Sequence, residues 1–143
     1  MTNPVNGVSP ILPTLFEGAL RELRTGLYRL SDTRYPGLRT RHYRLLGFIP
    51  DTGIRPARLV ELSGLTKQAL AQALAPLEDG GYVEVVADPD DRRARVVRLS
   101  DRGREVIAAL LEMQGGYERV WAERVGAARW AEAREVLIQL FWS

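Results

Sequence analysis

The stretch from Leu59 to Arg104, LVELSGLTKQALAQALAPLEDGGYVEVVADPDDRRARVVRLSDRGR, decides the fold of this chain. Thr66 opens a segment with the composition of a helix, and two runs rich in β-branched residues follow it, at Tyr82–Ala87 and Arg95–Leu99. Such residues favour strands, while the Pro and Asp residues of Asp88–Arg93 favour a turn between them. A helix followed by a hairpin with an arginine-bearing turn predicts a winged helix-turn-helix.

Two helices are expected before the hairpin, with a break at Ser63–Leu65. Pro56 suits the start of the first helix because its φ is fixed and it has no N–H to leave unpaired. Thr66 is a good N-cap for the second helix. Apolar residues of that helix recur at helical spacing and predict a buried stripe, at Leu70, Leu74 and Leu77. Its opposite face carries Lys67, Gln68, Ala71, Gln72 and Ala75.

From about Leu38 to Arg104 the chain resembles the MarR family of transcriptional regulators. The segment Asp88–Ser100 resembles the wing of that family, and the pair Gly103-Arg104 follows it as in the family. Thr66–Leu70 resembles the start of the family's recognition helix. The resemblance implies a homodimeric, DNA-binding regulator with a mainly α fold, in which a winged helix-turn-helix is flanked by N- and C-terminal dimerisation helices.

Two positions of the recognition helix depart from the family pattern. Ala75 and Pro76 stand where many relatives carry polar or basic residues, and Pro76 is expected to kink the helix because it supplies no N–H. Both departures point to modest affinity for DNA. They keep open an alternative function, a winged-helix protein-interaction module with weak or no DNA binding. An enzyme is not expected, because no nucleophile elbow, phosphate-cradling glycine loop or acid-base cluster is visible.

The exposed face of the recognition helix carries the first set of residues expected to contact double-stranded operator DNA. Thr66 and Lys67 stand at the helix N-terminus, where backbone N–H groups and a cation favour phosphate. Gln68 and Gln72 lie one turn apart and are candidates for base edges, since Gln pairs well with adenine. Ala71 is small enough to approach a thymine methyl group.

The turn of the hairpin carries the second set. Arg93 is expected to enter the minor groove, because narrow A/T-rich grooves concentrate negative potential. The resemblance implies that Asp91 orients Arg93. Arg92 and Arg95 are expected to contact phosphate.

Composition limits the other chemistry of the chain. It has 143 residues, 45% of them hydrophobic, with a formal net charge of +2, which suits one soluble domain. The absence of cysteine excludes disulfides, thiolate metal sites and cysteine-based oxidation sensing. His42 is the only histidine, so a metal contact there would need a second copy of the chain. We expect no cofactor, metal or catalytic residue.

The flanking regions predict how the chain is organised. Residues 1–13 are expected to be a disordered arm, and residues 14–143 a single MarR-like domain. Its winged helix-turn-helix spans about 39–100, and its dimerisation helices span about 14–31 and 101–142. No targeting signal or apolar stretch long enough for a membrane is visible, so a cytoplasmic location without a membrane partner is expected.

Long apolar helices at both ends predict a homodimer. Thr14–Glu17 matches a capping box, and leucines recur after it in a heptad-like pattern. Near the other end, a helix starting at Ser100 is expected to continue through Gly115-Gly116, and a last helix spans about Ala127–Phe141. One small domain cannot cover both apolar surfaces, and a two-fold partner would do so.

The MarR resemblance also implies a small-molecule effector. The family commonly responds to small, often phenolic, molecules bound between the dimer helices and the winged domain. Aromatic and histidine side chains that are candidates for lining such a site are Tyr28, Tyr35, His42, Tyr43 and Trp121. We favour ordinary core packing over a ligand contact for each of them. The predicted protein is a repressor that a small aromatic effector releases from its operator.

Overall fold

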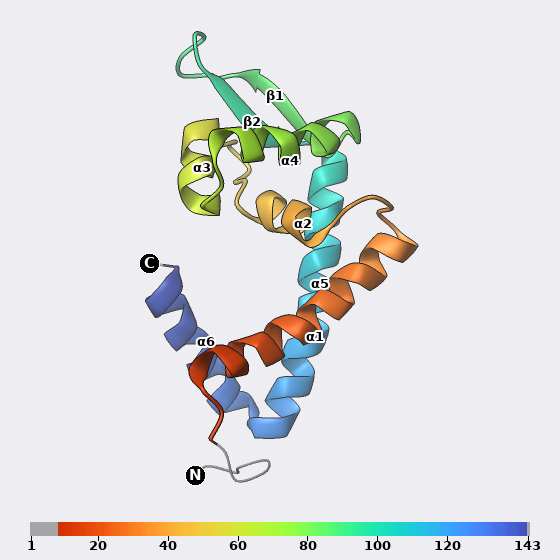
Figure 1. The fold of residues 1–143 in the computed structure, drawn as a ribbon, viewed down its shortest axis with the longest axis vertical. Coiled ribbons are helices and arrows are strands. Elements are labelled where there is room, and N and C mark those ends of the chain that lie inside the picture. The colour runs from red at the N-terminus through yellow and green to blue at the C-terminus, as the bar shows by residue number, and fades with distance from the viewer. Residues whose placement is uncertain (1–8, 143) are drawn as a thin grey trace. The chain divides into compact units, whose positions relative to one another are not determined.

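The computed structural model describes residues 9–142, in which six α-helices and one two-stranded antiparallel sheet are found (Figure 1). The prediction of a mainly helical fold with a small β-hairpin wing is confirmed. None of the helices in this range is long and apolar enough to cross a membrane. The elements, in chain order, are α1 (Leu12–Thr33), α2 (Thr40–Gly47), α3 (Pro56–Ser63), α4 (Lys67–Asp79), β1 (Val83–Ala87), β2 (Arg95–Leu99), α5 (Asp101–Val125) and α6 (Ala127–Phe141).

The chain forms two compact units. Residues 27–111 form the winged-helix unit, which contains α2, α3, α4, the hairpin, the end of α1 and the start of α5. The described part of the terminal-helix unit comprises residues 9–26 and 112–142, with the start of α1, the end of α5 and α6. Residues 1–8 of the predicted N-terminal arm lie outside the described residues.

Each helix of the winged-helix unit contributes to one apolar core. Leu46 of α2, Leu59 of α3, Leu77 of α4 and Val106 of α5 are fully buried. Burying such a side chain stabilises a fold by about 1.5 to 3 kcal/mol. The core therefore fixes which side of each helix faces solvent.

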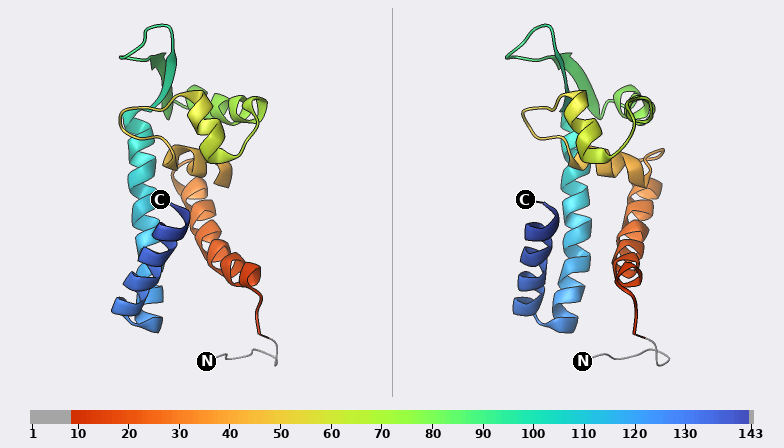
Figure 2. Two further views of the ribbon diagram at one scale, coloured as in Figure 1. Left: turned by 90° about the vertical axis from the view of Figure 1, so that its left-hand side faces the viewer. Right: turned by 60° about the vertical axis from the view of Figure 1, so that its left-hand side comes forward.

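The wing is an antiparallel hairpin whose register runs from Val83 opposite Leu99 to Ala87 opposite Arg95. Ile54, just before α3, extends this sheet through an isolated bridge to Val97. In both views of Figure 2 the hairpin extends beyond α3 and α4, with its loop at the far end.

The start of α5 packs closely against the start of the hairpin. Ser100 caps the helix by accepting the N–H of Gly103 on Oγ (3.1 Å). Arg102 donates to the carbonyl of Gly80 (2.6 Å) and its guanidinium lies 4.4 Å from the centre of the Tyr82 ring. Gly103 itself is buried directly against the Tyr82 backbone carbonyl. These contacts connect α4, the wing and α5.

In the terminal-helix unit, α6 runs back along the C-terminal part of α5 (Figure 2). Trp121 and Trp130 meet edge to face at 5.2 Å, and Arg134 donates to the Glu118 carboxylate (2.7 Å). Two predictions are confirmed here: α5 continues through Gly115-Gly116, and α6 spans the expected range. None of the described α6 residues is buried.

One detail of the helices differs from the sequence-based expectation. The first helix begins at Leu12, so Thr14 lies inside it and does not cap it. Pro13 explains the earlier start, because its fixed φ and missing N–H suit a first helical turn. The helix α4 ends at Asp79, as the sequence predicts, and it runs through Pro76 although this proline supplies no hydrogen-bond donor.

Gly103→Ala should destabilise the winged-helix unit by about 1 to 3 kcal/mol, because a Cβ there would overlap the Tyr82 carbonyl. Gly18→Ala is the matched control, since it lies in α1 with nothing within 4 Å of an added Cβ. This control should stabilise the protein by about 0.5 to 1 kcal/mol. Urea unfolding measures both free energies, and equal stability of G103A and wild type would contradict the close packing.

Candidate nucleic-acid interface

The turn between α3 and α4 is set by one glycine and one threonine. Gly64 ends α3 in the left-handed conformation (φ 69°), and its N–H donates to the Val60 carbonyl (3.0 Å). The Thr66 hydroxyl accepts the N–H of Ala69 (3.1 Å) and caps α4, so the predicted N-cap is confirmed. The two helices thereby form a helix-turn-helix.

One face of α4 is buried and the other is open to solvent. Leu70, Ala73 and Leu77 are buried, and Leu74 is half-buried. The predicted apolar stripe is therefore confirmed. The exposed residues of the helix include all of those expected to contact DNA, namely Lys67, Gln68, Ala71 and Gln72. They lie together along one side of the helix because residues three and four apart share a face.

Hydrogen bonds inside the loop between β1 and β2 order the wing tip. Oδ1 of Asp88 accepts the N–H of Asp90 (2.9 Å), and Oδ1 of Asp91 accepts the N–H of Arg93 (3.1 Å). The N–H of Ala94 donates to the Asp91 carbonyl (2.9 Å). Such contacts are typical of Asp in turns. Asp91 thus orders the backbone that carries Arg93, and no ion pair joins their side chains in the described chain.

The cationic side chains that are expected to contact phosphate are not neutralised by carboxylates of the described chain. Lys67, Arg92, Arg93 and Arg95 are exposed, and none of them forms an ion pair within residues 9–142. By contrast, neighbouring cations such as Arg98 are paired, in this case with Glu84 (3.1 Å). A charge without a carboxylate partner needs no exchange of partners before it meets a phosphate. The individual DNA contacts stay predictions.

Sequence reasoning missed an ion pair at the base of the wing. Arg55, which precedes α3, donates from Nε (3.0 Å) and Nη2 (2.8 Å) to Oδ2 of Asp88, a residue only 8% exposed. The N–H of Asp90 and the Arg55 guanidinium lower the pKa of the Asp88 carboxyl. The Asp-Pro pair that opens the loop is a local signal for Asp88. No local signal identifies a partner 33 residues away.

The residues predicted to line an effector site lie in different surroundings. Tyr35, His42 and Tyr43 are buried in the core of the winged-helix unit. Trp121 belongs to the terminal-helix unit, where its indole N–H donates to a Glu22 carboxylate oxygen (2.7 Å). Tyr28 is exposed on α1. It lines a surface groove of the winged-helix unit together with Ser31, Asp32, Pro36, Gly37, Leu38, Arg39, Thr40 and Arg41.

His42 is buried with one of its ring nitrogens hydrogen-bonded. Nδ1 accepts the N–H of Arg39 (2.9 Å), whereas Nε2 has no hydrogen-bond partner in the described chain. The neutral ring therefore carries its proton on Nε2. Burial, and then the nearby charges of Arg41 and Arg39, lower the pKa of His42. Within residues 9–142 no group of three or more His, Asp or Glu side chains is arranged to hold a metal ion.

The chain is similar over most of its length to known regulators of transcription. A profile of the MarR family matches residues 37–94. The transcriptional regulator HosA of Escherichia coli O157:H7 is 30% identical over 132 residues, which cover 89% of this chain and 94% of HosA.

Solved structures share the fold. CouR from Rhodococcus jostii RHA1, bound to p-coumaroyl-CoA, matches with a TM-score of 0.71 at 20% identity, over 92% of this chain and 90% of CouR. A mutant MarR from E. coli complexed with operator DNA matches with a TM-score of 0.66 at 20% identity, over 91% of this chain and 90% of that chain. At these identities the likeness concerns the fold alone.

His42→Gln should remove a pH dependence of stability. Because the pKa of His42 is lowered in the folded state, the unfolded chain takes up a proton first as pH falls through about 6.5, and the free energy of unfolding then decreases. Glutamine can accept the Arg39 N–H but cannot be protonated. Urea unfolding at pH 7.5 and 5.5 should show a larger loss for wild type than for H42Q. Equal losses would contradict this role of His42.

Proposed function

The chain belongs to the MarR family of transcriptional regulators, and on that premise we propose that it is a homodimeric repressor that binds a pseudo-palindromic operator and is released by a small-molecule effector. Members of this family are DNA-binding regulators and not enzymes, so the prediction of a non-enzymatic regulator is confirmed. Action on genomic DNA would place the protein in the cytoplasm.

The observation that carries the DNA-binding proposal is the exposed polar face of α4 beside an arginine-tipped wing in the same compact unit. The 13-residue α4 is about 20 Å long and has the width to enter a major groove. Gln68 and Gln72 would face base edges, while Lys67 would meet phosphate at the helix N-terminus. Arg93 at the wing tip would reach the adjacent minor groove, as arginines of the homeodomain N-terminal arm do.

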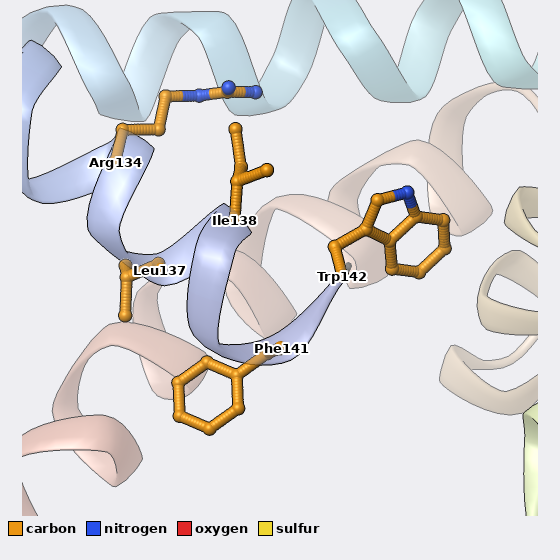
Figure 3. A pocket seen from close by; sticks show the side chains of 5 residues that line it. All are labelled: Arg134, Leu137, Ile138, Phe141 and Trp142. Carbon is orange, nitrogen blue, oxygen red and sulfur yellow. The ribbon is translucent and has the colours of Figure 1, made fainter.

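The homodimer proposal is supported by exposed apolar surface in the terminal-helix unit. Leu140, Phe141 and Trp142 are 67%, 68% and 67% exposed. Figure 3 shows an apolar hollow on α6, and the residues that line it are Arg134, Leu137, Ile138, Phe141 and Trp142. On α1 and just before it, further large apolar residues are exposed, namely Ile11, Leu12, Leu15, Phe16 and Leu20. The rings of Phe16 and Phe141 meet edge to face with their centres 6.2 Å apart, so the two exposed groups adjoin, and a second copy is the proposed cover.

Two-fold symmetry would give the dimer two copies of α4 and two wings. Such an arrangement recognises half-sites one DNA turn apart, about 34 Å, on a roughly palindromic operator. Repression is proposed on the premise that the operator overlaps a promoter, from which the bound dimer would exclude other proteins.

The effector proposal rests on the groove beside Tyr28. The exposed phenol ring of Tyr28 lines this groove together with Arg39, from the segment between α1 and α2, and Arg41, from the start of α2. An aromatic molecule could stack on this ring. CouR, which has the same fold, binds p-coumaroyl-CoA. Release from the operator requires that the effector bind the DNA-free state more tightly than the DNA-bound state.

Arg93→Ala and Gln68→Ala should weaken DNA binding in different ways. Each dimer of R93A loses two wing cations, so the slope of log affinity against log salt should become shallower by up to about 2. Q68A should keep that slope but lose preference for operator over random DNA, since a base contact is worth about 1 to 3 kcal/mol. Fluorescence anisotropy titrations at several salt concentrations measure both effects.

Arg129→Ala is the control for these titrations, because this exposed arginine of α6 lies outside the proposed interface and its loss should leave the slope unchanged. Equal losses on operator and random DNA for Q68A would reject Gln68 as a base reader. Absent or salt-insensitive binding by the wild-type protein would overturn the DNA-binding proposal and favour the protein-interaction module.

The double variant Leu140→Asp/Phe141→Asp should convert the dimer to monomers and lower operator affinity. Two charges per chain would enter a surface that the second copy must desolvate, which costs several kcal/mol. Ala128→Asp, at the opposite end of α6, adds the same kind of charge as a control. Sedimentation velocity measures the oligomeric state, and a double variant that remains dimeric would reject this interface.

A further inference from the structure

An ion pair at the base of the wing connects the wing to the helix-turn-helix. Arg55 stands one residue before α3, and Asp88 stands one residue after β1. Two guanidinium nitrogens lie within 3.0 Å of the same carboxylate oxygen of Asp88. The Asp88 side chain is 10% exposed and the Glu84 side chain of the Arg98–Glu84 pair is 52% exposed, so the carboxylate of the Arg55–Asp88 pair is the better shielded from water. A charge-assisted contact in which a largely buried carboxylate oxygen accepts two guanidinium N–H groups is stronger than an exposed ion pair.

A backbone contact lies beside this pair. Ile54, the neighbour of Arg55, exchanges two hydrogen bonds with Val97 of β2, with N–O distances of 2.9 and 2.8 Å. An isolated two-stranded hairpin is at best marginally stable in water. The segment at 54–55 therefore holds one strand of the wing through its backbone and the start of the wing loop through a side chain.

We propose that the Arg55–Asp88 pair is a positioning device for DNA binding, which holds the wing loop in place so that Arg93 and α4 engage one duplex together. This role rests on the proposed DNA-binding function. Asp88 also accepts the N–H of Asp90, so the same carboxylate joins the internal order of the loop to α3. A loop that is already ordered loses less conformational freedom on binding, and this raises affinity without any new contact.

A direct contact of Arg55 with phosphate is the competing explanation, because its side chain is 53% exposed. The two explanations differ for a change at Asp88. If Arg55 acts only on phosphate, removal of the neighbouring carboxylate frees a cation and reduces repulsion from DNA, so affinity should rise or stay constant. If the pair positions the wing, the same change should lower affinity.

The decisive variant is Asp88→Asn. Asparagine keeps an oxygen that can accept the Asp90 N–H and so preserves the turn, but it lacks the charge that holds Arg55. We expect operator affinity to fall about three- to tenfold. Glu84→Gln is the matched control, because it removes a carboxylate from an arginine pair that lies within the hairpin. That control should bind operator as tightly as wild type, or more tightly.

A double-mutant cycle gives an independent readout. Arg55→Ala should weaken binding in the wild-type background but have less than about a twofold effect when Arg93 is already alanine, because the Arg93 contact that the pair positions is then already lost. A phosphate contact of Arg55 would instead be additive with Arg93. Arg98→Ala removes an equal charge from the other pair and serves as the matched control.

Circular dichroism and thermal unfolding would establish that each variant is folded before binding is compared. Asp88→Asn that binds as tightly as wild type, or additive losses in the Arg55 and Arg93 cycle, would overturn the positioning role while leaving DNA binding intact. Failure of the wild-type protein to bind DNA would overturn the proposed function and this role with it.

Discussion

Burial of Leu70, Ala73 and Leu77 sets the rotation of α4 about its own axis, and the DNA-facing surface depends on that rotation. With these three side chains in the core, Gln68 and Gln72 are left on the outside. A turn of the helix by one residue, about 100°, would bring polar side chains into the core, where an unpaired amide is costly. The apolar stripe therefore presents the polar face as a consequence of packing, and the Thr66 cap fixes where that face begins.

The loop of the wing has no apolar core of its own, so other contacts must order it. Carboxylates do this by accepting backbone N–H groups, Asp88 from Asp90 and Asp91 from Arg93. These contacts direct negative charge toward the loop's own backbone, while Arg92 and Arg93 extend into solvent without ion-pair partners in the described chain. For DNA binding, the position of these arginines on the wing therefore matters more than the formal net charge of +2.

Local chemistry predicted most of this fold, and contacts distant in sequence account for what was missed. Periodicity and capping gave α4, α5 and α6, because each depends on residues within one or two turns. The start of α1 was misplaced because Thr14 imitates a cap although Pro13 already suits a first turn. The partner of Asp88 could not be predicted, since it depends on how separate elements pack. Core packing was the favoured interpretation of the aromatic candidates and His42, and it is observed for Tyr35, His42 and Tyr43 but not for the exposed Tyr28. Aromatic residue type alone does not distinguish a core position from a ligand contact.

The exposed apolar surface of α1 and α6 lies in the terminal-helix unit, whereas the DNA-facing surface lies in the winged-helix unit. Helices α1 and α5 contribute to both units, so each crosses the boundary as continuous backbone. Under the proposed function, dimerisation through the terminal-helix unit would set the spacing of two α4 helices, and the operator accepts only a spacing near one turn of DNA, about 34 Å. A ligand in the groove beside Tyr28 would not need to touch either DNA-binding element. It would need only to favour dimers whose α4 spacing does not fit the operator, and DNA would then weaken ligand binding by the same factor.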